Sequence, residues 1–286
     1  MSGKTRVCGL LANPVEHTLS PILHNTLAEK TGIHLVYVPL KPELENLGAA
    51  VEGAYSLNML GLNVSIPFKQ EVMKYLVDID KSAKDIGAVN TLVRTDSGFK
   101  GYNTDISGLK KAFIAEGIKI KDENVIILGA GGAAKAIAYL MALEGASKIY
   151  ILNRTYDRAT IIAKEINECF SKEVVIPMSI KEYKRLPKDS YLGIQTTSVG
   201  MYPNVSSAVV EDPEFYKLLH TAYDIIYSPA ETKFMKYTKE AGGRSFNGLK
   251  MLLYQGVVAY ELWNQIQVSD EIVDEVYTYM EQELRK

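Results

Sequence analysis

The sequence predicts an α/β protein with two domains, and three observations carry this prediction. Short apolar runs alternate with helical segments from the amino terminus onwards, which is the order typical of a largely parallel sheet. A second series of the same kind opens at Asn124, where an apolar run ends in a glycine-rich turn. With 286 residues, 47% of them hydrophobic, the chain is also long enough to form two cores.

The first domain is expected to span residues 1–105. Its elements are predicted in this order: strand 6–11, helix 21–30, strand 35–38, helix 43–55, strand 60–66, a short helix around Val72, and strands 89–95 and 99–104. Ser20 as N-cap, Pro21 in the first turn and Gly32 after the end define the first helix. The last two strands are joined through Asp96-Ser97-Gly98, which predicts a β-hairpin.

The second domain is expected to span residues 106–246. A bridging helix at 106–116 leads into the strand that starts at Asn124, and further strands are predicted at 148–152, 174–176, 192–196 and 223–226. Two amphipathic helices follow at 249–265 and 270–285. Because no strand remains for these helices to connect to, we expect residues 247–286 to pack back on the first domain.

The charge and hydropathy of the chain narrow the class of partner. The formal net charge is −2 and there is no long basic run, which argues against binding to nucleic acid or to a membrane surface. No apolar stretch reaches the ~18–20 residues of a membrane span, and the first residues lead into a strand rather than a signal peptide. We therefore expect a cytoplasmic protein that binds small molecules. As a separate expectation, we take it to be a monomer or a homodimer.

The cysteines and histidines do not follow the spacing of a metal site or a disulfide framework. Cys8 lies in an apolar strand and Cys169 lies near a predicted helix end, far away in the sequence. The histidines lack the H-E-x-x-H pattern or any comparable spacing; they are His17, His24, His34 and His220. We expect no metal.

The glycine-rich turn predicts a dinucleotide site. Gly129, Gly131 and Ala134 occupy the three places of the fingerprint G-x-G-x-x-G/A, between an apolar strand and a helix of small residues. Without bulky side chains, the backbone N–H groups at the start of the helix can meet a pyrophosphate. The alternative is an ordinary strand-to-helix turn without a ligand.

The end of the next strand predicts which dinucleotide binds. Asn153 stands 24 residues past Gly129, where NAD sites place a carboxylate for the ribose. Arg154 follows it, and Arg158 lies on the same face of the following helix. A guanidinium offers a 2′-phosphate paired, charge-assisted hydrogen bonds, whereas a carboxylate would repel it. The pattern favours NADP(H) over NAD(H), the alternative being arginines that are merely solvated.

Four further segments place polar side chains at predicted strand-to-loop junctions: residues 13–21, 63–69, 87–91 and 101–105. In the first, Thr18 and Ser20 precede a helix N-terminus, and hydroxyls beside the positive end of a helix suit a carboxylate. Lys69 and Asp105 end the second and fourth segments, so we expect them to face each other across the cleft between the domains. Taken singly, each residue has a simpler explanation, such as a helix cap, a solvated lysine or, for Asn90, a hairpin amide.

Taken together, these segments resemble the shikimate dehydrogenase family. Residues 12–21 correspond to its glycine-asparagine-proline…histidine-serine-x-serine-proline motif, and residues 63–69 to its asparagine-valine-threonine-x-proline-x-lysine motif. The resemblance spans nearly the whole chain in the family's order and takes in these further segments: 87–92, 101–105, 129–134, 153–155, 197–201, 224–227 and 247–255.

The resemblance implies reduction of 3-dehydroshikimate to shikimate by hydride transfer from NADPH, in the pathway to chorismate and the aromatic amino acids. It implies Lys69 as the main acid/base, and Asp105 as the group that orients it and hydrogen-bonds the substrate. The implied substrate-binding residues are Thr18, Ser20, Ser65, Lys69, Asn90, Asp105, Tyr227 and Gln255. The implied cofactor-binding residues are Gly129, Ala130, Gly131, Gly132, Ala133, Asn153, Arg154, Thr155, Arg158, Ile225 and Gly248.

Several positions depart from the family pattern. Thr18 replaces the usual serine and Ser65 the usual threonine, so one change crowds the expected ring pocket and the other enlarges it. These changes leave open a quinate/shikimate dehydrogenase with broader substrate or NAD use, because a pocket rejects an added hydroxyl only on the order of 10²-fold. Gln195 replaces an asparagine near the cofactor, and the sequence gives no prediction of what this change does. A third hypothesis, a non-catalytic NADP-binding sensor, is expected to lack Lys69 and Asp105, and both are present.

Overall fold

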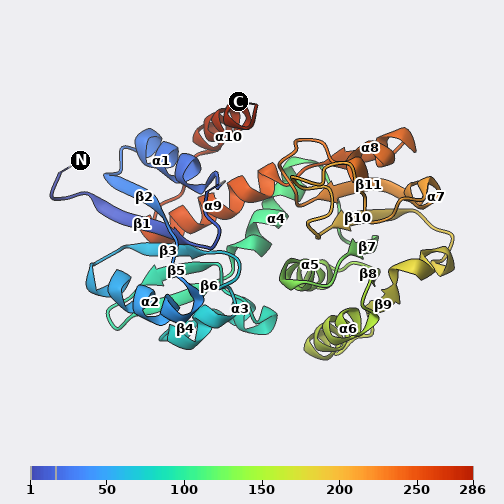
Figure 1. The fold of residues 1–286 in the computed structure, drawn as a ribbon, viewed down its shortest axis with the longest axis horizontal. Helices are drawn as coiled ribbons and strands as arrows, with labels where there is room; N and C mark the ends of the chain where they lie inside the picture. The colour runs from blue at the N-terminus through green and yellow to red at the C-terminus, as the bar shows by residue number, and fades with distance from the viewer. Residues whose placement is uncertain (1, 17, 286) are drawn as a thin grey trace. The chain divides into compact units, whose positions relative to one another are not determined.

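The fold was determined as a computed structural model, which describes residues 2–16 and 18–285. The chain forms two compact units (Figure 1): Met1–Leu109 with Leu252–Lys286, and Lys110–Met251. The divisions fall inside two helices, α4 (Thr104–Ala115) and α9 (Leu249–Asn264), each of which begins in one unit and ends in the other. His17, one of the histidines considered for metal binding, lies outside the described residues.

The first unit contains a mixed six-stranded sheet in the order β2-β1-β3-β5-β6-β4. Its elements are β1 (Arg6–Leu11), α1 (Ser20–Thr31), β2 (Leu35–Leu40), α2 (Leu47–Ser56), β3 (Gly61–Val64), β4 (Asp78–Ile79), α3 (Lys81–Ile86), β5 (Thr91–Arg94), β6 (Phe99–Tyr102) and α10 (Asp270–Leu284). Strand β1 pairs in parallel with β2 and β3, whereas β5 pairs antiparallel with β3 and β6. The predicted hairpin is therefore confirmed. The segment around Val72 forms a 3-10 helix, Glu71–Tyr75, and β4 and α3 were not predicted.

Helix α1 carries the first polar segment and differs from its prediction at one end. Leu23 and Leu27 are fully buried, and Gly32 ends the helix in the left-handed conformation with φ 69°, as expected. The prediction that Ser20 is the N-cap is wrong, because Leu19 holds that position and Ser20 is the first helical residue. The Thr18 hydroxyl accepts the backbone N–H of Ser20 at 3.2 Å, which satisfies one of the free N–H groups of the first turn.

The carboxyl-terminal helices return to the first unit, as predicted. Helix α10 packs against α1. In α9, the Trp263 indole N–H donates to the carbonyl of Leu92 at 2.9 Å, and the Tyr260 hydroxyl lies 2.6 Å from that of Thr31. These bonds tie α9 to both β5 and α1.

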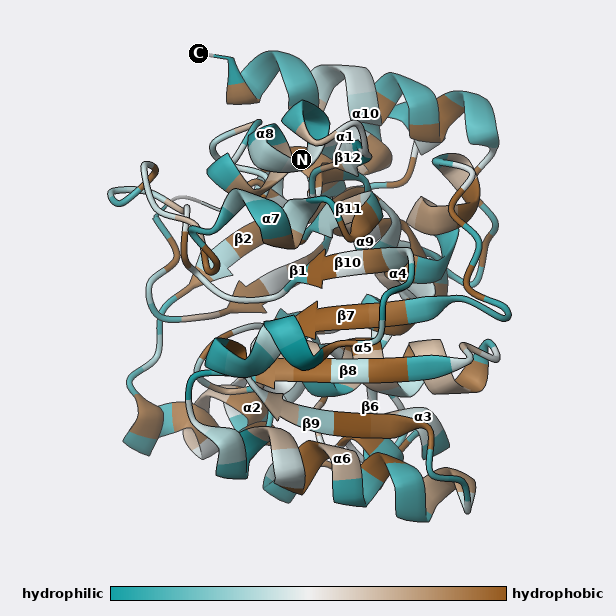
Figure 2. Cartoon of the chain, turned by 90° about the vertical axis from the view of Figure 1, so that its right-hand side faces the viewer, coloured by the Kyte–Doolittle hydropathy of each residue, from teal (hydrophilic) through white to brown (hydrophobic). Residues whose placement is uncertain are grey.

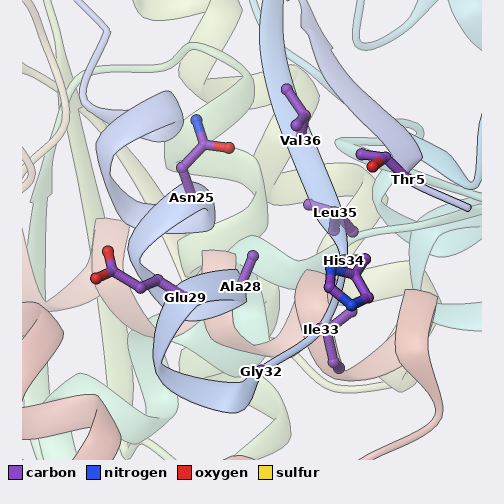
Figure 3. A pocket seen from close by; sticks show the side chains of 9 residues that line it. All are labelled: Thr5, Asn25, Ala28, Glu29, Gly32, Ile33, His34, Leu35 and Val36. Carbon is purple, nitrogen blue, oxygen red and sulfur yellow. The ribbon is translucent and has the colours of Figure 1, made fainter. Parts of the chain in front are cut away.

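At the β2 edge of the first sheet, one side chain is hydrogen-bonded to the backbone of a central residue of the strand. The Asn25 side chain accepts the backbone N–H of Tyr37 at 2.8 Å and donates to the Tyr37 carbonyl at 3.0 Å. It thus supplies the two bonds that a neighbouring strand would supply to β2. Beside it lies a hollow of about 350 Å³ between the end of α1 and the start of β2, lined by Thr5, Asn25, Ala28, Glu29, Gly32, Ile33, His34, Leu35 and Val36 (Figure 3). None of the implied site residues lines it.

The second unit contains a six-stranded parallel sheet in the order β12-β11-β10-β7-β8-β9. Its elements are β7 (Asn124–Leu128), α5 (Gly132–Leu143), β8 (Lys148–Asn153), α6 (Tyr156–Phe170), β9 (Val175–Ser179), β10 (Tyr191–Gln195), α7 (Pro213–Tyr216), β11 (Leu219–Asp224), α8 (Lys233–Glu240) and β12 (Arg244–Phe246). This is the strand order of a dinucleotide-binding Rossmann fold, so the predicted fold class is confirmed.

The strands of this sheet are buried on both faces, which explains their continuous apolar sequences. Successive residues of β7 are fully buried although they point to opposite faces of the sheet. Figure 2 shows β9, β8, β7 and β10 side by side, with many hydrophobic residues along them. Ile126 and Leu128 pack in one cluster with Phe234 of α8. The predicted strand at 223–226 is shifted, because β11 ends at Asp224 and the next two residues lie in a loop. No helix in the described part of the chain has both the length and the hydropathy of a membrane span.

Candidate active site

Lys69 and Asp105 form an ion pair in the first unit. Lys69 follows β3 at the end of a short loop, and Asp105 is the second residue of α4. The Lys69 Nζ lies 2.7 Å from Asp105 Oδ2, and the two side chains are 30% and 18% exposed. Lys69 is therefore not a merely solvated lysine. Both residues belong to the first unit, in line with their place in the predicted first domain, and they face each other as expected.

Asn90 completes the surroundings of the Asp105 carboxylate. Its Nδ2 donates to Asp105 Oδ1 at 2.8 Å, so that each carboxylate oxygen accepts one bond, from Asn90 or from Lys69. The Asn90 Oδ1 accepts the backbone N–H of Thr104 at 2.7 Å, which fixes the orientation of the amide. Asn90 is thus a hydrogen-bond partner of the Asp105 carboxylate, rather than an ordinary hairpin amide. A charged lysine held beside a carboxylate can donate a proton to an oxygen that gains negative charge.

The predicted carboxylate-binding hydroxyls meet at the start of α1. The Thr18 hydroxyl donates to that of Ser20 at 3.1 Å, and Ser20 is 7% exposed. Ser65 follows β3 and is half-buried, four positions before Lys69. Two hydroxyls at a helix N-terminus offer donors where the helix dipole favours an anion.

Gln255 and Tyr227 lie elsewhere in the chain. Gln255 belongs to α9 in the first unit, where its Nε2 donates to the carbonyl of Leu252 at 2.9 Å. Tyr227 belongs to the second unit, in the loop after β11, and burial raises the pKa of its hydroxyl. A phenol in this state remains a hydrogen-bond donor at neutral pH.

The glycine turn of the second unit is open where a phosphate would need space. A Cβ added at Gly129, whose φ is 113°, would lie 2.6 Å from Thr196 Oγ1, so this position must be glycine. At Gly131 and Gly132 a Cβ would have no atom within 4 Å, and both residues are exposed. Ala130 and Ala133 are half-buried beside them. The N-terminus of α5 therefore presents unobstructed backbone that fits a pyrophosphate.

The predicted 2′-phosphate residues lie at the carboxyl end of β8. Arg154, Thr155 and Arg158 are exposed, and the Asn153 Nδ2 donates to the Thr155 carbonyl at 2.8 Å. Among the residues that the structure describes, neither arginine has an acidic partner. Both guanidinium groups are available to an anionic ligand.

Gly248 and Ile225 are in contact in the same unit. A Cβ at Gly248 would lie 2.1 Å from the Ile225 carbonyl oxygen, and the Gly248 N–H donates to the Ile226 carbonyl at 3.0 Å. Only glycine allows this approach, which joins the loop after β11 to the start of α9.

Comparisons with known proteins agree with this geometry. The family model described as shikimate dehydrogenase substrate binding domain matches residues 10–92, and the one described as shikimate / quinate 5-dehydrogenase matches residues 111–185. A shikimate dehydrogenase (NADP(+)) from Methanocaldococcus jannaschii is 39% identical over 273 residues, which cover 96% of this chain and 96% of the relative. The chain belongs to the shikimate dehydrogenase family.

Two solved members of the family have the same fold over nearly their whole length. The shikimate 5-dehydrogenase from Listeria monocytogenes, in complex with shikimate and NAD, gives a TM-score of 0.89 at 32% identity, covering 96% of this chain and 97% of that one. The shikimate 5-dehydrogenase from Thermus thermophilus, in complex with NADP(H) and shikimate, gives 0.83 at 28% identity, covering 96% and 100%.

Three buried residues beside Asn90 were not assigned to the site of this shikimate dehydrogenase family member from sequence. Asn63 Nδ2 donates to the Thr91 hydroxyl at 3.1 Å, and the Thr91 hydroxyl lies 3.0 Å from Asn90 Oδ1. The Tyr37 hydroxyl in turn donates to Asn63 Oδ1 at 2.8 Å. The signal in the sequence was the presence of Asn63 and Thr91 inside two of the polar segments, but Tyr37 reads as an ordinary strand residue.

No cluster of three or more histidine, cysteine, aspartate or glutamate side chains suited to a metal occurs among residues 2–16 and 18–285. Cys8 is buried and Cys169 is exposed, and both are free thiols.

Proposed function

We propose that this protein catalyses the reversible reduction of 3-dehydroshikimate to shikimate with NADPH. The observation that carries the proposal is the ion pair of Lys69 with Asp105 at 2.7 Å, held by Asn90. The names of the family relatives, which include shikimate dehydrogenase (NADP(+)), support the same activity and cofactor.

Lys69 acts as the acid in the reduction and as the base in the reverse reaction. NADPH, when bound, supplies the hydride to the ketone carbon. As the ketone oxygen gains negative charge, the Lys69 ammonium stabilises it and transfers a proton, which leaves an alcohol. Asp105 holds the ammonium in place and accepts a hydrogen bond from the neighbouring ring hydroxyl. One N–H of the Asn90 amide is bound to Asp105, and we assign the other N–H to the substrate.

The other substrate-binding roles follow from the chemistry of each group. Thr18 and Ser20 bind the ring carboxylate, because their hydroxyls meet at the N-terminus of α1. The remaining residues, Ser65, Asn90, Tyr227 and Gln255, bind ring hydroxyls or the carboxylate.

The cofactor is held by the carboxyl ends of the parallel strands. The pyrophosphate binds the backbone of Gly129, Ala130, Gly131, Gly132 and Ala133. Arg154, Arg158, Thr155 and Asn153 bind the 2′-phosphate, which an acidic residue in their place would repel. Ile225 and Gly248 line the remainder of the site.

These roles define the proposed domains. Residues 1–105 with 247–286 form the substrate-binding and catalytic domain, and residues 106–246 form the NADP-binding domain. We place the enzyme in the cytoplasm, since two free thiols suit a reducing compartment. We also propose that it is a monomer or a homodimer.

A steady-state comparison on the purified protein tests the function. Initial rates are measured with shikimate or quinate, each with NADP or NAD. We expect the highest kcat/KM for shikimate with NADP. A higher value for quinate with NAD would refute both the substrate and the cofactor, and no turnover together with tight NADP binding would indicate the non-catalytic sensor.

A second candidate is a quinate/shikimate dehydrogenase, which the same experiment distinguishes. Two observations favour it: Thr18 and Ser65 depart from the family pattern, and the model that matches residues 111–185 covers both substrates. Against NAD use stand Arg154 and Arg158, which are exposed and have no acidic partner in the described part of the chain. The sensor hypothesis is disfavoured by the intact Lys69–Asp105 pair.

A further inference from the structure

Gln195 stands where the family pattern has asparagine. Its side chain forms hydrogen bonds that the sequence did not predict. It is the last residue of β10 and is fully buried. Its Oε1 accepts the backbone N–H of Thr197, and its Nε2 donates to the carbonyls of Thr197 at 3.2 Å and Val199 at 3.0 Å. A single amide therefore bonds three backbone groups of residues 197–199, as a neighbouring strand would.

Asp224 joins this set from the adjacent strand. It is the last residue of β11, is fully buried, and lies 3.4 Å from the Gln195 Nε2, so that the two N–H groups of that amide are shared among three acceptors. Its two oxygens also accept the Thr232 hydroxyl at 2.6 Å and the Ile226 N–H at 3.0 Å. We call Gln195 and Asp224 the end-of-strand pair. It connects the loops that follow β10 and β11.

The loop that this pair holds lies against the glycine turn. The Thr196 N–H and hydroxyl donate to the Leu128 carbonyl at 3.0 and 2.7 Å. A Cβ at Gly129 would meet both Thr196 and Thr197, at 2.6 and 2.8 Å. Strands β7 and β10 are neighbours whose connections run to opposite sides of the sheet, and ligands of such sheets bind at the carboxyl ends of that pair.

The cost of this arrangement argues that it has a purpose beyond stability. Burial raises the pKa of Asp224 to about 6, so its ionised form is stabilised less well in the fold than in water. Apolar side chains of similar volume often replace a buried polar cluster without loss of stability. The hydrogen bonds of the pair go mainly to the backbone of the loops at the carboxyl ends of the strands, where we propose that the cofactor binds.

We propose that Gln195 and Asp224 are positioning residues for NADP(H), which hold residues 196–199 in the conformation that binds the cofactor. The inference rests on the proposed function for the identity of the dinucleotide. Gln195 has the length to reach Thr197, Val199 and Asp224 together, whereas asparagine is one methylene shorter. Most of the proposed shikimate ligands belong to the other unit, so the effect falls on the cofactor rather than on the substrate.

The test uses the full-length protein and compares Gln195→Met, which keeps the volume but removes the amide, with Gln195→Asn. Thr238→Val is the matched control, since it removes a buried hydroxyl whose one partner among the described residues is the carbonyl of Phe234 in its own helix. The dissociation constant of NADPH is measured by fluorescence titration without substrate, and the KM of shikimate by initial rates. Amide hydrogen exchange of Thr197 and Val199 is followed in the apoprotein.

We expect Gln195→Met to raise the NADPH dissociation constant about tenfold, the effect of losing one to two net hydrogen bonds. The KM of shikimate should change less than twofold, and exchange at Thr197 and Val199 should accelerate. Gln195→Asn should lie between this variant and the wild type, and it remains informative if Gln195→Met does not fold. Thr238→Val should bind NADPH as the wild type does.

Unchanged NADPH binding in both Gln195 variants would overturn the inference, as would an equal weakening in Thr238→Val. A wild-type protein that binds NADPH but does not oxidise shikimate would refute the proposed function and leave the inference standing. If the wild type oxidises shikimate with full activity but the Gln195 variants bind NADPH unchanged, the inference is refuted and the proposed function stands.

Discussion

Replacing His24 with leucine should make the stability of the first unit less sensitive to acid. The His24 ring is fully buried, stacks on Tyr37 with a centroid distance of 4.2 Å, and lies 5.1 Å from the Trp263 ring. Neither ring nitrogen has a hydrogen-bond partner among the described residues. Burial disfavours the charged ring and outweighs the nearby Asn63 side chain, which favours it, so that the pKa of His24 falls from 6.5 to about 3.

The sign and size of the effect follow from proton linkage. The folded pKa lies below the unfolded value of 6.5, so His24 contributes no penalty above pH 6.5 and destabilises the fold as the pH falls towards 3. At pH 5 the unfolded chain binds nearly one proton more at this residue than the folded chain does. At about 1.36 kcal/mol per pH unit, the wild type should lose roughly 2 kcal/mol more than His24→Leu between pH 7.5 and pH 5.

Urea titration at the two pH values measures this difference. Trp263 is the chain's single tryptophan, so its fluorescence reports unfolding of the unit that contains His24. The change in packing caused by leucine is present at both pH values and cancels in the comparison. His34→Gln, at an exposed position, is the control and should follow the wild type. Equal losses of unfolding free energy in His24→Leu and the wild type would refute the reasoning.

Three further predictions concern the proposed reaction. Lys69→Ala should lower kcat by about 10²–10⁴ with a much smaller change in the KM of shikimate, because it removes the acid/base group; near-normal turnover would remove Lys69 from the chemistry, and Lys74→Ala, at a 66% exposed lysine, should keep full activity. Arg154→Ala should weaken NADPH binding much more than NADH binding in a fluorescence titration, and equal losses would mean that the guanidinium does not contact the phosphate. Restoring the family residues in the double variant Thr18→Ser/Ser65→Thr should lower kcat/KM for quinate relative to shikimate; an unchanged ratio would show that these positions do not control specificity.

The parts of the site that depend on local sequence were predictable. The turn at Gly129 and the arginine after β8 are defined by residues close together in the chain, and the structure has them at the expected strand ends. The pairing of Lys69 with Asp105 was also anticipated, because each followed a predicted strand or hairpin.

The contacts that depend on sheet register were not predictable. Asn63 meets Thr91 because β3 and β5 pair antiparallel with these two residues opposite each other, and a slip of one residue would have pointed them to different faces. The start of β11 was missed because His220 and Thr221 interrupt the apolar pattern that predicts a strand. The N-cap of α1 was misplaced because Leu19, an apolar residue that does not signal a cap, holds that position, and the N–H of Ser20 is bonded to the Thr18 hydroxyl instead.

The bonds between Asn25 and Tyr37 restrict how copies of this protein can associate. An open sheet edge normally offers its backbone groups to a strand from another chain, which leads to edge-to-edge dimers or to aggregation. On β2 the central N–H and C=O are already occupied by the Asn25 amide, so an incoming strand would have to break both bonds before it gained any. Self-assembly through this edge is therefore disfavoured, and a homodimer of the enzyme should form through a different surface.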